Sequence, residues 1–80
     1  MELALSERKT RWIGAELERL KALQAATEAE QTRQTTWLEL ARFAGRPDLV
    51  ERFDARLIET RRTLTNIRWA LEKLARGETF

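Results

Sequence analysis

The chain has 80 residues, 15 Lys and Arg against 13 Asp and Glu, a net charge of +2, and neither cysteine nor histidine. At this length we expect a single small domain over residues 1–80. The missing cysteines exclude disulfides and thiolate metal sites, and the missing histidines remove the commonest general base and metal ligand. Charged residues at 35% beside 42% apolar ones favour a soluble helical protein over a disordered one.

The N-terminal sequence does not resemble a targeting signal. Residues 1–7 contain an acidic residue at position 2 and no apolar run of signal-peptide length. Nowhere do 18 consecutive apolar residues occur, so no membrane span is expected. We therefore expect a cytoplasmic protein without a membrane partner.

The first part of the chain predicts one long helix over about residues 2–44. Only Gly14 disfavours it, at a cost of about 1 kcal/mol relative to alanine. The helix is either continuous or broken at Gly14 into a short N-terminal helix and a longer one. Residues 2–13, which include Leu3, Leu5 and Trp12, would then overhang, either packing under the open end of the hairpin or docking on another chain. The larger apolar residues form two clusters, one far from the turn and one beside it: Ile13, Leu17, Leu20 and Leu23, and Trp37, Leu40, Ala41 and Ala44.

A turn over residues 45–47 separates this helix from a second one over about residues 48–76. Gly45 is typical of a left-handed helix C-cap, and Pro47 pushes the preceding residue out of helical geometry. Asp48 followed by Glu51 predicts a capping box at the start of the second helix. Gly77 marks its end. No paired, alternating segments predict strands, so the fold class is all-α.

The second helix carries a regular apolar seam, and we expect the first helix to pack against it. Apolar residues recur at alternating spacings of three and four, with one polar member. The short connection favours an antiparallel hairpin of coiled-coil type. The seam consists of Val50, Phe53, Leu57, Thr60, Leu64, Ile67, Leu71 and Leu74.

Counting outward from the turn places Thr60 at the level of Arg33 and Gln34. We expect one polar layer there within an otherwise apolar seam. One interpretation is a layer that sets the register of the two helices, as polar core positions often do in coiled coils. The other is a small polar pocket in which Gln34 faces Thr60 and Arg33 reaches around, with Glu30 as its one titratable neighbour.

A two-helix hairpin buries little apolar surface, so association is expected, most simply as a dimer that forms a four-helix bundle. The outer face of the second helix offers an apolar stripe at i, i+4, i+7 and i+11, and tryptophan and arginine are enriched at the centres of protein interfaces. Trp69 either packs against the N-terminal overhang or forms part of this interface. The candidate partner-binding residues are Ile58, Arg62, Thr65, Trp69 and Trp12.

The inventory of residues argues against catalysis. Ser6 is the single serine, and Lys9 would be its only activating partner. Close carboxylates such as Glu28 and Glu30 stand two residues apart, on different sides of a helix. There is no glycine-rich phosphate loop, and leucines occupy the seam where a carboxylate metal site would lie. We expect no enzyme activity, catalytic residue, metal, cofactor or small-molecule substrate.

Nucleic-acid binding is the alternative function. Six basic residues against two acidic ones between residues 56 and 76 give this part of the second helix a local charge of +4. A dimeric hairpin with basic residues on one face resembles, in architecture alone, the small plasmid RNA-regulating hairpin proteins. No helix-turn-helix, zinc finger or aromatic RNA-binding motif is present. The candidate nucleic-acid contacts are Arg56, Arg61, Arg62, Arg68 and Arg76.

The function that the sequence favours is protein recognition without catalysis. A small hairpin with a strong heptad seam and exposed Trp and Arg suits an adaptor, an inhibitor or immunity protein, or a small chaperone. In gross plan it is similar to the helical-hairpin co-chaperones of bacterial type III secretion, which share this length, a proline near the start of the second helix and an apolar second helix. The expected partner is another protein, a second copy of the chain, or both.

Overall fold

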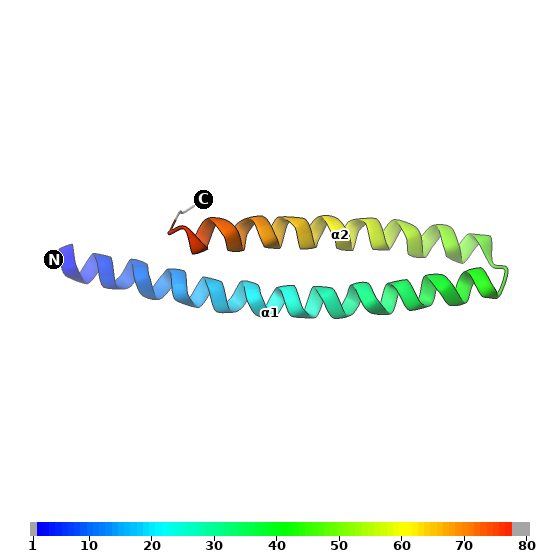
Figure 1. Cartoon of the computed structure of the whole chain (residues 1–80), viewed down its shortest axis with the longest axis horizontal. Helices are drawn as coiled ribbons and strands as arrows, with labels where there is room; N and C mark the ends of the chain where they lie inside the picture. Colours follow the sequence, from blue (N-terminus) through cyan, green and yellow to red (C-terminus); the bar gives the residue numbers. More distant parts are fainter. Residues whose placement is uncertain (1, 78–80) are drawn as a thin grey trace.

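Two antiparallel helices make up the part of the chain that the structure describes. In this computed structural model the backbone is described for residues 2–77 and the side chains for residues 7–77. Helix α1 spans Glu2–Phe43 and helix α2 spans Pro47–Ala75. They lie side by side in a rod of 65 × 17 × 14 Å (Figure 1). The predicted all-helical hairpin is confirmed.

Helix α1 is continuous, so the break considered at Gly14 does not occur. The glycine is exposed on the helix surface, and nothing lies within 4 Å of the position that a Cβ atom would take there. With 42 residues against 29, α1 is 13 residues longer than α2, which corresponds to about 20 Å of helix. Its N-terminal end runs past the end of α2 (Figure 1). Residues 7–12 are exposed there, while the side chains of Leu3, Leu5 and Ser6 lie outside the described residues.

The turn has the geometry that its glycine predicts. Gly45 adopts a φ of 66°, in the left-handed region that favours glycine. The amide of Gly45 donates to the carbonyl of Arg42 at 3.1 Å, and the amide of Arg46 donates to the carbonyl of Ala41 at 3.0 Å. This pair of bonds is a Schellman motif, which satisfies carbonyls that the end of α1 would otherwise leave without donors. Gly77 ends α2 with a φ of 75°.

The capping box predicted for Asp48 and Glu51 is wrong. Helix α2 begins one residue earlier, at Pro47, and Arg46 occupies the N-cap with a φ of −107° and no side-chain cap hydrogen bond. Proline is favoured at the first helical position because it lacks an N–H and its φ is already helical. The Asp48 carboxylate instead accepts hydrogen bonds from the Arg46 guanidinium at 3.1 and 3.3 Å.

The seam predicted for α2 is confirmed as the side that faces α1. Leu57, Leu64, Ile67 and Leu74 are buried, and the other four seam residues are partly buried. The fully buried side chains are Leu64 and Leu74, at 2% and 1% exposed. Burial of these leucines contributes about 1.5–3 kcal/mol each and holds the hairpin together.

The inner face of α1 differs from the two apolar clusters expected. Leu38, which the sequence analysis left out, is buried at 5% exposure, whereas Leu40 is 52% exposed. Leu23 and Trp37 also lie outside the core, and Ala44 is exposed. The reason is the heptad frame, in which positions spaced by three and four face α2 even where they are polar. The inner face consists of Ile13, Leu17, Leu20, Gln24, Thr27, Gln31, Gln34, Leu38 and Ala41.

Candidate functional site

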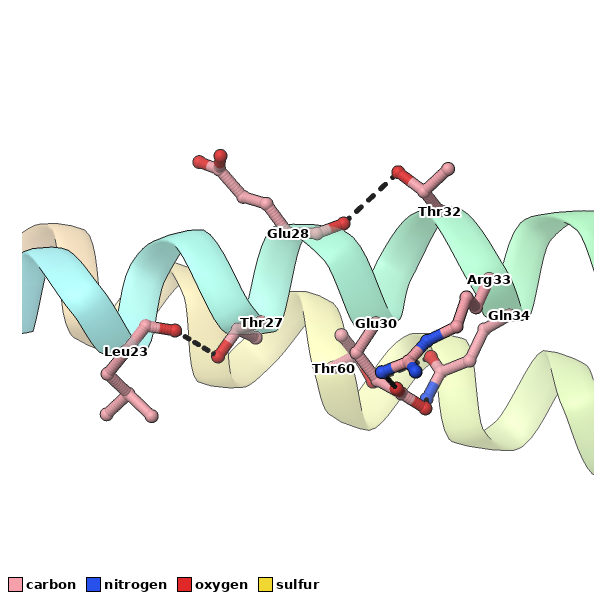
Figure 2. Close-up of polar contacts among 8 residues, drawn as sticks. All are labelled: Leu23, Thr27, Glu28, Glu30, Thr32, Arg33, Gln34 and Thr60. Carbon is pink, nitrogen blue, oxygen red and sulfur yellow. Dashed lines mark hydrogen bonds and ion pairs between the residues drawn. The ribbon is translucent and has the colours of Figure 1, made fainter.

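A polar layer crosses the middle of the hairpin, as the sequence predicted. The Thr60 hydroxyl lies 2.7 Å from Gln34 Oε1 on the other helix and 3.0 Å from the carbonyl oxygen of Arg56. Gln34 Nε2 donates to Glu30 Oε1 at 3.3 Å, and the Arg33 guanidinium pairs with the other carboxylate oxygen of Glu30. Figure 2 shows Glu30, Arg33, Gln34 and Thr60 gathered on one side of α1. The bond between Thr60 and Gln34 joins the two helices.

The members of the layer bind one another. Glu30, its one titratable acid, is bound by Arg33 and Gln34. Among the described residues no buried side-chain nitrogen or oxygen lacks a hydrogen-bond partner. The neighbouring Thr27 satisfies its hydroxyl locally, on the carbonyl of Leu23 at 2.7 Å (Figure 2). The layer has features of both interpretations: its buried polar atoms are all paired, as in a register-setting layer, and hollows of about 330 and 410 Å³ lie beside Glu30 and Arg33.

The outer face of α2 carries the stripe predicted for partner binding, defined by Ile58, Arg62, Thr65 and Trp69 and called here the α2 outer stripe. Ile58 is 46% exposed and Trp69 is 51% exposed. A shallow hollow of about 410 Å³ lies along it, lined by Ile58, Arg61, Arg62, Thr65 and Asn66. The structure therefore brings an exposed apolar side chain and two guanidinium groups to one place on the surface.

Trp69 extends this stripe, whereas Trp12 does not reach it. The Lys73 ammonium lies 5.6 Å from the centre of the Trp69 ring, a cation–π distance. Trp12 is 47% exposed and lies within the first 13 residues of α1, the number by which α1 exceeds α2 in length. Because α1 is unbroken, residues 2–13 cannot fold back onto Trp69, so the alternative in which they cover it is wrong.

The five candidate arginines for nucleic acid do not converge on one surface. Arg62 pairs with Glu59 at 3.5 Å on its own helix, and Arg68 pairs with Glu28 of α1 at 3.7 Å. By heptad position, Arg61 and Arg68 lie on one edge of the hairpin, Arg56 on the opposite edge, and Arg62 and Arg76 on the outer face. Arg76 pairs with Glu72. Three of the five arginines are thus ion-paired, and the five spread over three directions instead of forming one basic face.

A surface that sequence reasoning missed runs along one edge of α1. Its large apolar members are Leu23, Trp37 and Leu40, which are 42%, 56% and 52% exposed. The Trp37 ring stacks on Phe53 of α2, with ring centres 6.4 Å apart and 19° between their planes. The signal in the sequence was a second set of residues at spacings of three and four. This α1 edge stripe consists of Glu16, Arg19, Leu23, Ala26, Glu30, Arg33, Trp37, Leu40 and Ala44.

Ion pairs lie at regular steps within the α1 edge stripe. The Arg19 guanidinium donates to both oxygens of Glu16, the shortest bond being 2.9 Å, and holds the pKa of that carboxyl below its ordinary value. Glu30 and Arg33 repeat the arrangement 14 residues later. The stripe thus alternates charged and apolar steps along the helix.

No group of three or more metal-ligating side chains occurs in the described part of the chain. Over the same residues, neither helix contains a stretch apolar enough to cross a lipid bilayer. Comparison with known proteins found no matching family model, no matching curated protein and no matching solved structure.

Proposed function

We propose that the protein is a non-catalytic interaction module that binds a partner protein through the α2 outer stripe. The observation that carries this proposal is the hollow beside Ile58, which Arg61 and Arg62 also line. Trp69 is exposed on the same stripe, one helical turn after Thr65. An apolar centre with arginines at its rim is the composition enriched in protein interfaces. The partner surface that fits is an apolar side chain flanked by carboxylates.

The module belongs functionally with small adaptors, inhibitors or immunity proteins, and chaperone-type hairpins. It works without a cofactor, a metal or a small-molecule substrate, since its residues offer no nucleophile with an activating base. We further propose that it acts in the cytoplasm and that two hairpins associate into a four-helix bundle. Among the described residues, seven large apolar side chains are exposed, and they support association because a single hairpin leaves them in water.

The test is co-purification of a partner from the native cell, followed by binding of the identified, purified partner. Trp69→Ala and Arg62→Ala should each weaken that binding at least about tenfold, as expected for residues at an interface centre. Phe43→Ala and Arg52→Ala are matched controls, because both residues are exposed and lie outside the stripe. Unchanged binding by both stripe variants, with helicity intact, would refute the site.

Nucleic-acid binding is the second candidate, favoured by the two arginines, Arg61 and Arg62, that line the same hollow. It predicts binding that weakens steeply as salt rises, with a smaller salt slope when these two arginines are replaced by alanine. Absence of binding to duplex and single-stranded probes at low ionic strength would end this alternative.

A further inference from the structure

The α1 edge stripe is regular, exposed and independent of the α2 outer stripe. It runs beside the polar layer, and Figure 2 shows Leu23 on the same side of α1 as the Glu30–Arg33 pair, with Glu28 and Thr32 on the opposite side. Two apolar regions flank this pair, one around Leu23 and the other around Trp37.

Two copies of the stripe that lie antiparallel place complementary side chains opposite each other. If a second α1 is laid antiparallel, with a two-fold axis midway between Glu30 and Arg33, each Glu30 meets Arg33 of the second copy. The same rotation brings Leu23 opposite Leu40 of the second copy, and Ala26 opposite Trp37 of the second copy. Charge therefore meets opposite charge at the centre, and apolar groups meet apolar groups on both sides.

The shapes of the two surfaces are also complementary under this rotation. A hollow of about 330 Å³ extends from Ala26 to the central ion pair, and it is lined by Ala26, Thr27, Glu30, Arg33, Glu59, Thr60 and Thr63. Trp37, 56% exposed, projects on the other side of the Glu30–Arg33 pair. The two-fold axis therefore brings the tryptophan of each copy to the hollow of the other, a large side chain against a small one.

Neighbouring registers are less favourable. Shifting the second copy by one heptad sets Leu23 against Arg33 of the second copy. Setting Leu23 against Trp37 of the second copy instead places Glu30 against Glu30, and like charges at an interface are costly. The stripe thus selects one alignment of two identical helices.

We propose that the α1 edge stripe is the homodimer interface, with the two α1 helices antiparallel and centred between Glu30 and Arg33. This inference rests on the proposed four-helix bundle and specifies which face forms it. The overlap from Arg19 to Ala44 is about 38 Å long, and one helix about 10 Å wide gives α1 a footprint of about 380 Å² in each copy. Stable complexes bury about 800 Å² per partner, so the four-helix bundle must also cover the neighbouring edge of α2, which carries Glu59 and Thr63. The α2 outer stripe stays accessible to another protein.

The cysteine-free sequence allows a direct test of this alignment. Leu23→Cys and Leu40→Cys are made as two single variants, one carrying a tag that separates the three possible dimers by size. They are mixed under a mild oxidant. The mixed disulfide between the two variants should form at least about tenfold faster than either homodisulfide, because neighbouring cysteines act at an effective concentration in the millimolar range. Two copies of Leu23 would stand about 26 Å apart in this alignment, and a disulfide needs Cα atoms within about 7 Å.

Each outcome is decisive when the mass of the reduced variants is measured in parallel. Rapid formation of the Leu23→Cys homodisulfide would overturn the antiparallel alignment. A dimeric mass without an excess of the mixed disulfide would overturn the interface but leave the four-helix bundle standing. The assay is run in parallel with a second pair, Arg19→Cys and Ala44→Cys, up to the highest soluble concentration, and monomers with full helicity in both pairs would overturn both proposals. Partner binding through Trp69 is measured separately and survives any of these results.

Discussion

Replacing Leu64 by alanine probes the core of the hairpin most sharply. Leu64 is 2% exposed, and by register it lies opposite Gln31 on the inner face of α1. Leucine-to-alanine substitutions in protein cores cost about 2–5 kcal/mol. A core with one seam between two helices can partly close the cavity, so we expect the lower part of that range, about 2–3 kcal/mol. For a domain of this size, that loss lowers Tm by about 10–20 °C.

The matched control is Ile58→Ala on the same helix. Ile58 is 46% exposed, and alanine has the higher helix propensity, so the change should cost less than about 1 kcal/mol. Both variants are unfolded by heat and by urea, followed by far-UV circular dichroism at one protein concentration, because association adds to apparent stability. Equal losses in the two variants, or no loss in Leu64→Ala, would refute the assigned inner and outer faces of α2.

Three further predictions follow from the polar layer, the turn and the α1 edge stripe. Thr60→Val should lower the free energy of unfolding by about 0.5–1.5 kcal/mol, because Gln34 loses its hydrogen-bond partner on the other helix. Adding Gln34→Leu should restore most of that loss in a double-mutant cycle, because no buried polar group is then left without a partner. The hydrogen bond from Arg46 lowers the pKa of the Asp48 carboxyl in the folded protein. The stabilisation by the ionised carboxylate is therefore present above about pH 4 and is lost as pH falls through the lowered pKa. The Tm of the wild-type protein should exceed that of Asp48→Asn at neutral pH but not in acid, and a difference that persists at about pH 2 would contradict this reasoning. Ala26→Arg should weaken dimerisation at least about tenfold in sedimentation experiments, whereas Ala25→Arg, at a position that is also exposed but lies outside the stripe, should not.

Much of the fold could be predicted because the local signals agree with one another. The spacing of Leu57, Leu64 and Leu74 identified the buried face of α2, and Gly45 identified the turn. The polar layer followed from counting residues outward from the turn, which works because a Schellman-capped turn fixes the relative position of the two helices. These features depend on local geometry and on one short connection.

The errors arose where the sequence pattern was weak or where two signals competed. On α1 the inner face is mostly polar in its middle, so counting apolar residues favoured Leu40 over Leu38. At the start of α2, Pro47 was assigned to the turn and Asp48 to the cap, whereas Pro47 is the first helical residue because its fixed φ suits that position. Gly14 costs too little to break a long helix by itself.

The candidate sites were harder to predict than the fold. Trp12 was grouped with Trp69 because both are large and aromatic, yet Trp12 lies within the first 13 residues of the unbroken α1, the number by which α1 exceeds α2 in length. The α1 edge stripe was overlooked because Leu23, Trp37 and Leu40 had been assigned to the core, and only their exposure identifies them as a surface. Whether an apolar residue faces the partner helix or the solvent depends on the heptad frame, which the inner residues Gln31 and Gln34 help to define.

The central claim is that the hairpin associates with a second copy of itself. The most direct measurement is the solution mass of the purified wild-type protein by light scattering across a concentration series. We predict a stable mass near twice 9.4 kDa that persists on dilution into the micromolar range. A mass of 9.4 kDa at every concentration would contradict the claim and would leave the exposed apolar residues of α1 for another protein to cover.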